Sequence, residues 1–216
     1  MRAWIAGATG LTGTALLNEL LREPRFDRVV AFVRRPLALV DPKLAEAPAN
    51  FEHLREGNPG FVDAAFCCLG TTIKAAGSEA AFRQVDHDYV LAFAAAAQAH
   101  GATHFAVISS IGAGVHSRIF YNRTKGETER DLQNLGFASL AIYRPSFLVG
   151  NRPEQRRAER IGSIVAQVVS PLLLGPLKKY RAICADTLAQ AMLRQSLLAN
   201  SGTGVYESDV IQELGR

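Results

Sequence analysis

Residues 3–13 read AWIAGATGLTG, so an apolar run passes directly into a segment with three glycines. The run predicts a buried strand over Ala3–Ala6, and leucines at helical spacing predict a helix over Leu11–Arg22. Glycines between the two allow a sharp turn and let an anion approach the N–H groups of the helix N-terminus. The last glycine allows the helix to pack closely on the strand. This order of strand, glycine turn and helix is typical of a loop that holds a dinucleotide pyrophosphate.

Short apolar runs and helical patterns alternate through the first two thirds of the chain. Further strands are predicted over Arg28–Val33, Phe61–Leu69, Phe105–Ile108 and Ser139–Tyr143, helices over Ala80–His100 and Thr124–Leu135, and a loop over Asp41–Asn50. This alternation is typical of crossover units in a parallel sheet covered on both faces. We therefore expect an α/β fold, a Rossmann-type doubly wound parallel sheet, with residues 1–216 forming one NAD(P)-binding domain.

The last third of the chain differs in character. Residues 151–180 are rich in arginine and then apolar, and we expect them to form a small, variable substrate or lid segment. A helix near Asp186–Ala199 and a short strand over Gly204–Glu207 follow.

Composition excludes several classes of protein. Hydrophobic residues make up 48% of the 216 residues, which is ordinary for a globular chain. A net charge of +4 is too weakly basic to predict a nucleic-acid partner. Three cysteines do not form a disulfide framework, so we expect a reducing, cytoplasmic location. Uninterrupted apolar stretches fall short of the roughly 20 residues of a membrane span, and the scattered histidines lack the spacing of a metal site.

The end of the second predicted strand bears on the choice of dinucleotide. An acidic residue there would bind the ribose 2′-hydroxyl of NAD, whereas arginine accommodates the 2′-phosphate of NADP. Asp27 precedes this strand, and Arg34 and Arg35 follow it. A guanidinium binds phosphate bidentately, so the sequence favours NADP over NAD.

A second chemical pattern is the pentad Tyr121-Asn122-Arg123-Thr124-Lys125. Residues four apart lie on one face of a helix, and a lysine ammonium beside a phenol favours the phenolate, which suits a general acid/base. Ser110 ends a predicted buried strand and could polarise a substrate carbonyl beside the tyrosine. Ser109 is the alternative, because the sequence does not determine which hydroxyl faces the site.

Taken together, the motifs resemble the atypical, extended-like branch of the short-chain dehydrogenases/reductases. Within it the chain looks most similar to the Tat-interacting short-chain reductase-like proteins of animals and their bacterial relatives. The motifs that carry the resemblance are GATGLTG at 7–13, FCCLGTT at 66–72, VDHDYV at 85–90, VISSIGA at 107–113, YNRTK at 121–125 and RPSFLVG at 144–150.

The resemblance implies roles for individual residues. Tyr121 would give or take the substrate proton, Lys125 would hold the nicotinamide ribose, and Ser110 would bind the substrate oxygen. Many relatives place asparagine where Asp86 stands, which puts in doubt a proton relay through that helix. The residues expected to contact the cofactor are Gly7, Thr9, Gly10, Leu11, Thr12, Gly13, Arg34, Arg35, Leu69, Gly70, Thr71, Tyr121, Lys125, Pro145, Ser146 and Phe147.

Three functions are compatible with these residues. The first is an NADP-dependent oxidoreductase that transfers hydride between the nicotinamide and a small carbonyl or alcohol. The second is an NADP(H)-binding regulatory or scaffold protein with little turnover, which would bind a protein partner. The third is a methyltransferase that uses S-adenosylmethionine, although Arg34 and Arg35 argue against it. Apolar helix faces at Ala92–Ala99 and Leu132–Leu135 could serve a homodimer.

Overall fold

The structure, a computed structural model, describes residues 1–52, 54, 59–150, 175–198 and 200–216. Its main sheet has seven strands, all parallel, in the order β3-β2-β1-β4-β5-β6-β9. The strands are β1 (Arg2–Ala6), β2 (Arg28–Val33), β3 (Leu44–Pro48), β4 (Ala64–Cys67), β5 (His104–Ile108), β6 (Ser139–Arg144) and β9 (Gly202–Glu207). A second, two-stranded sheet pairs β7 (Leu148–Val149) with β8 (Ile183–Cys184). The predicted Rossmann-type fold is confirmed.

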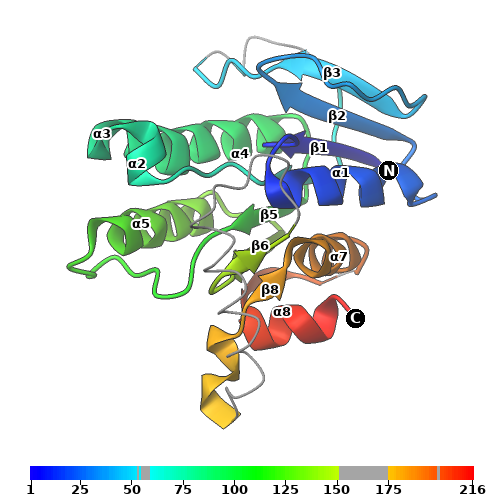
Figure 1. The fold of residues 1–216 in the computed structure, drawn as a ribbon. Helices are drawn as coiled ribbons and strands as arrows, with labels where there is room; N and C mark the ends of the chain where they lie inside the picture. The colour runs from blue at the N-terminus through cyan, green and yellow to red at the C-terminus, as the bar shows by residue number, and fades with distance from the viewer. Residues whose placement is uncertain (53, 55–58, 151–174, 199) are drawn as a thin grey trace.

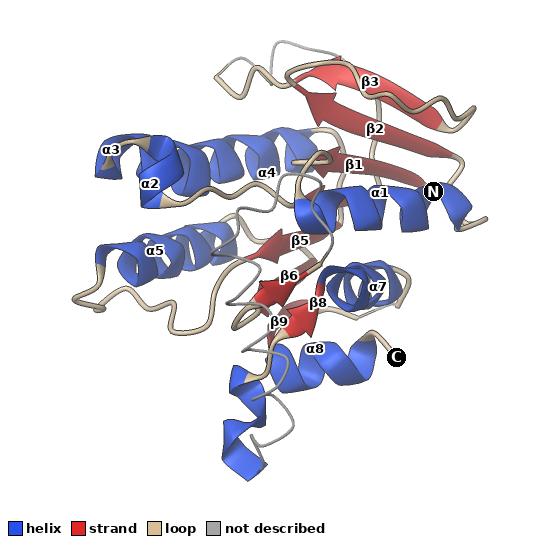
Figure 2. Ribbon diagram, in the orientation of Figure 1, coloured by secondary structure: helices blue, strands red, loops and turns tan. Residues whose placement is uncertain are grey.

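Helices cover both faces of the main sheet (Figures 1 and 2). They are α1 (Leu11–Arg22), α2 (Ile73–Ala76), α3 (Glu79–Arg83), α4 (Tyr89–Ala99), α5 (Phe120–Asn134), α7 (Ala185–Ser196) and α8 (Ser208–Leu214), with a π-helical turn η1 (Gln84–Asp88) and a 3-10 helix η3 (Gly175–Tyr180). Helices α1 and α7 lie on one face, and α4 and α5 lie on the other. No helix in the described ranges is long and apolar enough to cross a membrane.

The alternation of side chains along β1 divides the core into two layers. Ile5 packs with the residues of α1 and α7, whereas Trp4 and Ala6 pack with those of α4 and β5. All three side chains are essentially inaccessible to solvent. A strand buried on both faces reads as a continuous apolar run, which is why the sequence around β1 lacks polar alternation.

The order of strands reverses at β1. The chain moves from β1 outward to β2 and β3, then returns to place β4 on the other side of β1. In open parallel sheets the crevice at such a reversal, outside the carboxyl ends of the strands, is where ligands bind. The glycine turn after β1 and the loop after β4 border this crevice.

One predicted loop is a strand. Residues 41–50 were expected to be irregular, but Leu44–Pro48 pairs with β2 as β3. This strand lies at the edge of the sheet and has Pro48 as its last residue. A proline without an N–H group is tolerated at a sheet edge, so the proline does not exclude a strand here.

The predicted helix over Ala80–His100 is interrupted. Its residues form α3, the π-helical turn η1 and then α4, and these three elements follow one another without a gap in the sequence. Helix α5 begins at Phe120, four residues before the predicted start, so Tyr121 lies in its first turn. Of the expected variable segment 151–180, residues 151–174 lie outside the described part of the chain.

Helix α5 approaches the loop that precedes it very closely at Gly126. A side-chain carbon on Gly126 would overlap the backbone of Gly114, whereas one on Gly114 would meet no atom within 4 Å. The backbone of Gly114 donates to Asn122 O at 3.0 Å, so the loop and the first turns of α5 form one unit.

We predict that Gly126→Ala destabilises the protein by about 2 kcal/mol, because the added methyl group would overlap the backbone of Gly114, which is hydrogen-bonded to α5. Gly114→Ala is the matched control and should change the free energy of unfolding by less than about 0.5 kcal/mol. Urea denaturation of both variants measures the difference. Equal stabilities for the two variants would contradict the close contact between α5 and its loop.

Candidate functional site

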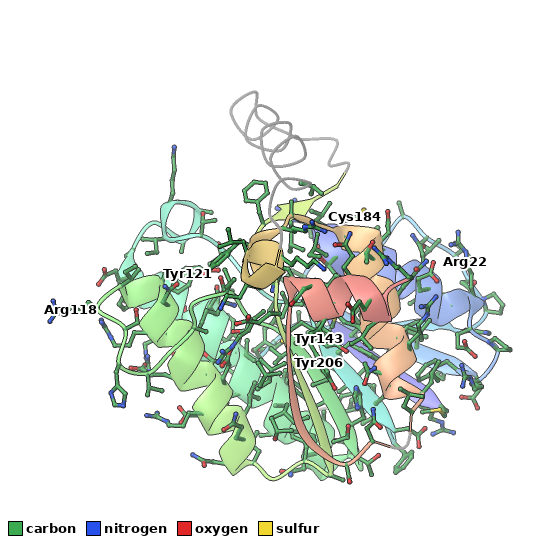
Figure 3. The ribbon with its side chains drawn as sticks, turned by 90° about the horizontal axis from the view of Figure 1, so that it is seen from below. Arg22, Arg118, Tyr121, Tyr143, Cys184 and Tyr206 are labelled. Carbon is green, nitrogen blue, oxygen red and sulfur yellow. The ribbon has the colours of Figure 1, made fainter. Side chains whose placement is uncertain are left out.

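The carboxyl ends of five parallel strands bring the predicted site segments to one edge of the main sheet. The glycine turn follows β1, Arg34 and Arg35 follow β2, residues 68–71 follow β4, residues 109–110 follow β5, and residues 145–147 follow β6. Helix α5 presents Tyr121 near the same edge. In Figure 3, Tyr121 appears on one side of η3 and Cys184, which precedes α7, appears on the other.

The glycine turn has a shape that side chains would prevent. Gly7 has φ +82°, and a Cβ on it would lie 2.5 Å from Cys68 O. A Cβ on Gly13 would overlap Gly7 O. The N–H of Gly10 donates to Gly7 O at 3.0 Å and closes the turn. The first turn of α1 is therefore held directly against the ends of β1 and β4.

The N-terminus of α1 offers donors to an anion. Its capping residue is Gly10, which provides no side-chain acceptor, and its first turn contains no acidic residue. Thr12 is buried, and its hydroxyl has no hydrogen-bond partner among the described residues. Free N–H groups, the helix dipole and an unpartnered hydroxyl together fit a pyrophosphate at this position.

Two arginines continue the site beyond β2. Arg34 and Arg35 are exposed, and neither forms an ion pair with a residue that the structure describes. Asp27 lies at the opposite end of β2, where its carboxylate is 3.4 Å from the N-terminal ammonium. The carboxyl end of β2 is therefore followed by two guanidinium groups, whereas the carboxylate of Asp27 lies at the other end of the strand.

Tyr121 and Lys125 lie one turn apart on α5, as the pentad predicted. The ring of Tyr121 packs 5.2 Å from that of Phe82. Lys125 is buried, and its Nζ lies 2.7 Å from Asp86 Oδ1 and donates to Ile108 O at 3.4 Å. Burial acts to lower the pKa of Lys125, but Asp86 and Tyr121 outweigh it and the pKa is raised. Lys125 is therefore an ammonium at neutral pH.

The two serines after β5 have different surroundings. Ser109 is buried, and its hydroxyl donates to the carboxylate of Glu129, which also accepts from Arg144 Nε at 2.9 Å. Ser110 is half-buried, and among the described residues its hydroxyl contacts only the adjacent Ile111 O, at 3.3 Å. This arrangement favours Ser110 as the hydroxyl available to a ligand.

The segment after β6 is fixed by contacts with the C-terminal elements. Pro145 is buried, and the N–H of Ser146 donates to Ser208 Oγ at 2.9 Å. The hydroxyl of Ser146 donates to Arg181 O at 2.5 Å, so the chain itself already engages this side chain. The ring of Phe147 is 45% exposed and remains available for contact at the edge of the sheet.

Sequence reasoning named Asp86 only as a departure from the asparagine of many relatives, and it missed the contacts of two groups at this edge. One is the carboxylate of Asp86, which reaches both Lys125 and the N–H of Thr71, the latter at 2.8 Å. The other is the ion pair between Glu129 and Arg144. The direction of the Asp86 side chain depends on the π-helical turn η1, and no periodic sequence pattern predicts such a turn. Glu129 lies four residues after Lys125 on α5, a spacing that could have pointed to the same helix face.

The chain belongs to the NAD(P)H-binding family, whose model matches residues 7–162. Protein HTATIP2 of Rattus norvegicus is 35% identical over 219 residues, which cover 99% of this chain and 88% of that relative. Protein FMP52, mitochondrial, of Eremothecium gossypii is 37% identical over 177 residues, which cover 80% of this chain and 77% of the relative. The predicted resemblance to the Tat-interacting proteins is confirmed.

Solved structures show the same fold at low sequence identity. Human epimerase family protein SDR39U1 with NADPH has a TM-score of 0.65 and 16% identity, and covers 96% of this chain and 74% of its own. MoeE5 in complex with UDP-glucose and NAD has a TM-score of 0.68 and 18% identity, with 95% and 75% coverage. Because the family binds NAD(P)H, the methyltransferase alternative loses its support.

The expected cytoplasmic location is wrong in the light of these relatives. Proteins from four fungi that match most of this chain are named as mitochondrial. A small number of cysteines argues against a disulfide framework, but it does not identify the compartment in which the protein resides.

We predict that Glu129→Ala destabilises the protein by about 3 kcal/mol, because it leaves Arg144 without its carboxylate and Ser109 without its acceptor. Glu127 on the same helix pairs with Arg83 in a partly exposed contact, and Glu127→Ala is expected to cost less than about 1 kcal/mol. Thermal and urea unfolding compare the two. Similar losses in the free energy of unfolding for the two variants would show that the more buried Glu129–Arg144 pair contributes no more than the Glu127–Arg83 pair.

Proposed function

We propose that the protein is an NADP-dependent oxidoreductase that transfers hydride between the nicotinamide and a small carbonyl or alcohol. The observation that carries the proposal is the position of Tyr121, one helical turn from a buried, charged Lys125, at the edge where the glycine turn lies. A phenol beside an ammonium suits proton transfer to or from an oxygen atom.

The chain's own residues would divide the work as follows. The nicotinamide, when bound, would supply the hydride to a carbonyl carbon or take it from an alcohol carbon. The Tyr121 hydroxyl donates its proton to the carbonyl oxygen as that oxygen gains negative charge, and Tyr121 becomes a phenolate; in the reverse direction the phenolate accepts the proton of the alcohol. Ser110 donates a hydrogen bond to the same oxygen and stabilises its charge. Lys125, which is paired with Asp86 and donates to Ile108 O, would hold a ribose hydroxyl of the cofactor.

The preference for NADP over NAD is proposed from the end of β2. Arg34 and Arg35 are exposed there and provide two guanidinium groups for a 2′-phosphate. In the same proposal, the loop residues Leu69, Gly70 and Thr71 lie beneath the dinucleotide, and Pro145, Ser146 and Phe147 flank the nicotinamide. The remaining loop residues proposed to hold the pyrophosphate are Gly7, Thr9, Gly10, Leu11, Thr12 and Gly13.

A regulatory or scaffold protein that binds NADP(H) with little turnover is the second candidate. It is supported by the same glycine turn, which fits a bound dinucleotide whether or not turnover follows. The two candidates share the cofactor site and differ in whether Tyr121 moves a proton. Consumption of NADPH in a broad screen of carbonyl compounds separates them.

We predict that Tyr121→Phe abolishes turnover of any carbonyl substrate found in that screen and leaves the dissociation constant for NADPH within about twofold, because only the proton donor is lost. Tyr89→Phe is the control, since the ring of Tyr89 is partly buried, packs against the core on the α4 side and stacks on Phe51 at 5.2 Å. Absorbance at 340 nm follows turnover, and calorimetry follows binding. Full activity in Tyr121→Phe would rule out the role assigned to the tyrosine.

We predict that replacing Arg34 and Arg35 together by alanine weakens NADPH at least tenfold and leaves NADH within about twofold. The reason is that a charge-assisted hydrogen bond contributes about 1.5–3 kcal/mol and only NADPH carries the 2′-phosphate. Arg28→Ala, at the opposite end of β2, is the control. Equal weakening of both cofactors would place the 2′-phosphate elsewhere.

A further inference from the structure

We propose that the substrate of this site carries its carbonyl or alcohol group on an uncharged hydrocarbon chain or ring, and that three apolar side chains bind that part of the molecule. The inference rests on the proposed function and names its substrate class. The three side chains are those of Phe147, Leu177 and Tyr180, and we call them the apolar rim.

The apolar rim is exposed although its side chains are large. Phe147 is 45% exposed, Leu177 51% and Tyr180 49%. Leu177 and Tyr180 lie three residues apart in the 3-10 helix η3, and residues at this spacing share one face of such a helix. A single exposed apolar side chain is ordinary, whereas several that gather beside a site mark a surface that binds a ligand or a partner.

Hydrogen bonds hold the segment of Phe147 against the end of η3. Ile183 N–H donates to Phe147 O at 2.8 Å, and Ser146 Oγ donates to Arg181 O at 2.5 Å. Arg181 directly follows Tyr180, and the pairing of β7 with β8 continues from these bonds. The two segments that carry the apolar rim are far apart in the sequence and are therefore fixed side by side.

The same segments border the proposed catalytic groups. Ile111 N–H donates to Pro145 O at 3.1 Å, and Ile111 directly follows Ser110. The loop after β5 is thus bonded to the segment after β6 that leads to the apolar rim. In the view of Figure 3, Tyr121 appears next to η3. The rim therefore lies where the rest of a molecule would extend when its carbonyl oxygen is bonded to Ser110 and Tyr121.

The charges near the apolar rim favour an uncharged substrate. Lys179 Nζ lies 3.7 Å from Glu207 Oε2 and 5.4 Å from the centre of the Tyr180 ring, so the chain itself already engages this cation. Arg144, at the end of β6, is paired with a carboxylate of α5. Lys178 is exposed and would bind a carboxylate or phosphate instead. An anionic substrate is therefore the alternative that the test has to exclude.

Contact with the apolar rim predicts a dependence on hydrocarbon length. Complete removal of one methylene group from water corresponds to about a fourfold change in affinity. Because the rim side chains are themselves half exposed, we expect about a twofold change for each methylene of the substrate.

The first test measures kcat/KM of the full chain with NADPH and two sets of aldehydes, by the absorbance of NADPH. Butanal, hexanal and octanal differ in hydrocarbon length, and benzaldehyde and 4-carboxybenzaldehyde differ in one carboxylate. We expect kcat/KM to rise about fourfold at each step from butanal to octanal, and to be at least about tenfold higher for benzaldehyde than for its carboxylate. Equal values along the series, or a preference for the carboxylate, would overturn the inference.

Leu177→Gln tests the apolar rim itself. We expect it to lower kcat/KM about tenfold for octanal and less than about threefold for butanal, with the dissociation constant for NADPH within about twofold. Leu198→Gln is the matched control, because Leu198 is 52% exposed and lies between the end of α7 and the start of β9, at the amino edge of the sheet. The same dependence on chain length in both variants would overturn the role of the rim.

A binding measurement without turnover separates this inference from the proposed function. Octanamide and butanamide are unreactive and differ only in hydrocarbon length, and the fluorescence of NADPH follows their binding to the NADPH-saturated protein. We expect octanamide to bind at least about tenfold more tightly than butanamide to wild type, and Leu177→Gln to reduce this ratio to less than about threefold.

The combined outcomes are distinct. If octanamide is preferred but no aldehyde is consumed, the proposed reaction is wrong and the apolar site stands. If aldehydes are consumed but the two amides bind equally, the substrate class is overturned and the proposed reaction stands. A wild-type chain that does not bind NADPH would overturn both.

Discussion

Helix α1 begins so close to the end of β1 that no side chain fits between them. A methyl group on Gly13 would overlap Gly7 O, and one on Gly7 would lie 2.5 Å from Cys68 O on the neighbouring strand segment. This close approach places the positive end of a helix dipole in the crevice where the strand order reverses. The functional assignments of the other loops depend on this close approach, because those loops are assigned to the site on the ground that they border the same crevice.

Two ion pairs with buried carboxylates lie on the α5 side of the site. Asp86 and Lys125 join the helices to the loop after β4, and Glu129 and Arg144 join α5 to the end of β6. Burying charge is unfavourable unless it is paired and hydrogen-bonded, and each carboxylate here has a second donor, Thr71 N–H or Ser109 Oγ–H. Such pairs fix geometry more than they add stability, which suits a site where a phenol and a ribose must meet.

The strands and helices that line the site could be predicted because each carries its own local signal. Leu11–Arg22 and Arg28–Val33 have the bounds that periodicity predicts. The edge strand β3 was missed, since its pairing with β2 is a tertiary contact and its proline looked like a loop signal. The contacts of Asp86 and Glu129 were missed for the same kind of reason. These contacts are determined by a π-helical turn and by the packing of α5 on β5 and β6. No periodic sequence pattern predicts either feature.

The central claim is that a dinucleotide binds across the carboxyl edge of the sheet with its pyrophosphate on the first turn of α1. Calorimetric titration of the folded protein with NADPH tests it most directly. The account predicts a saturable heat with one site per chain. A folded protein that gives no saturable heat with NADPH or NADH, at two temperatures chosen to avoid a vanishing enthalpy, would contradict it.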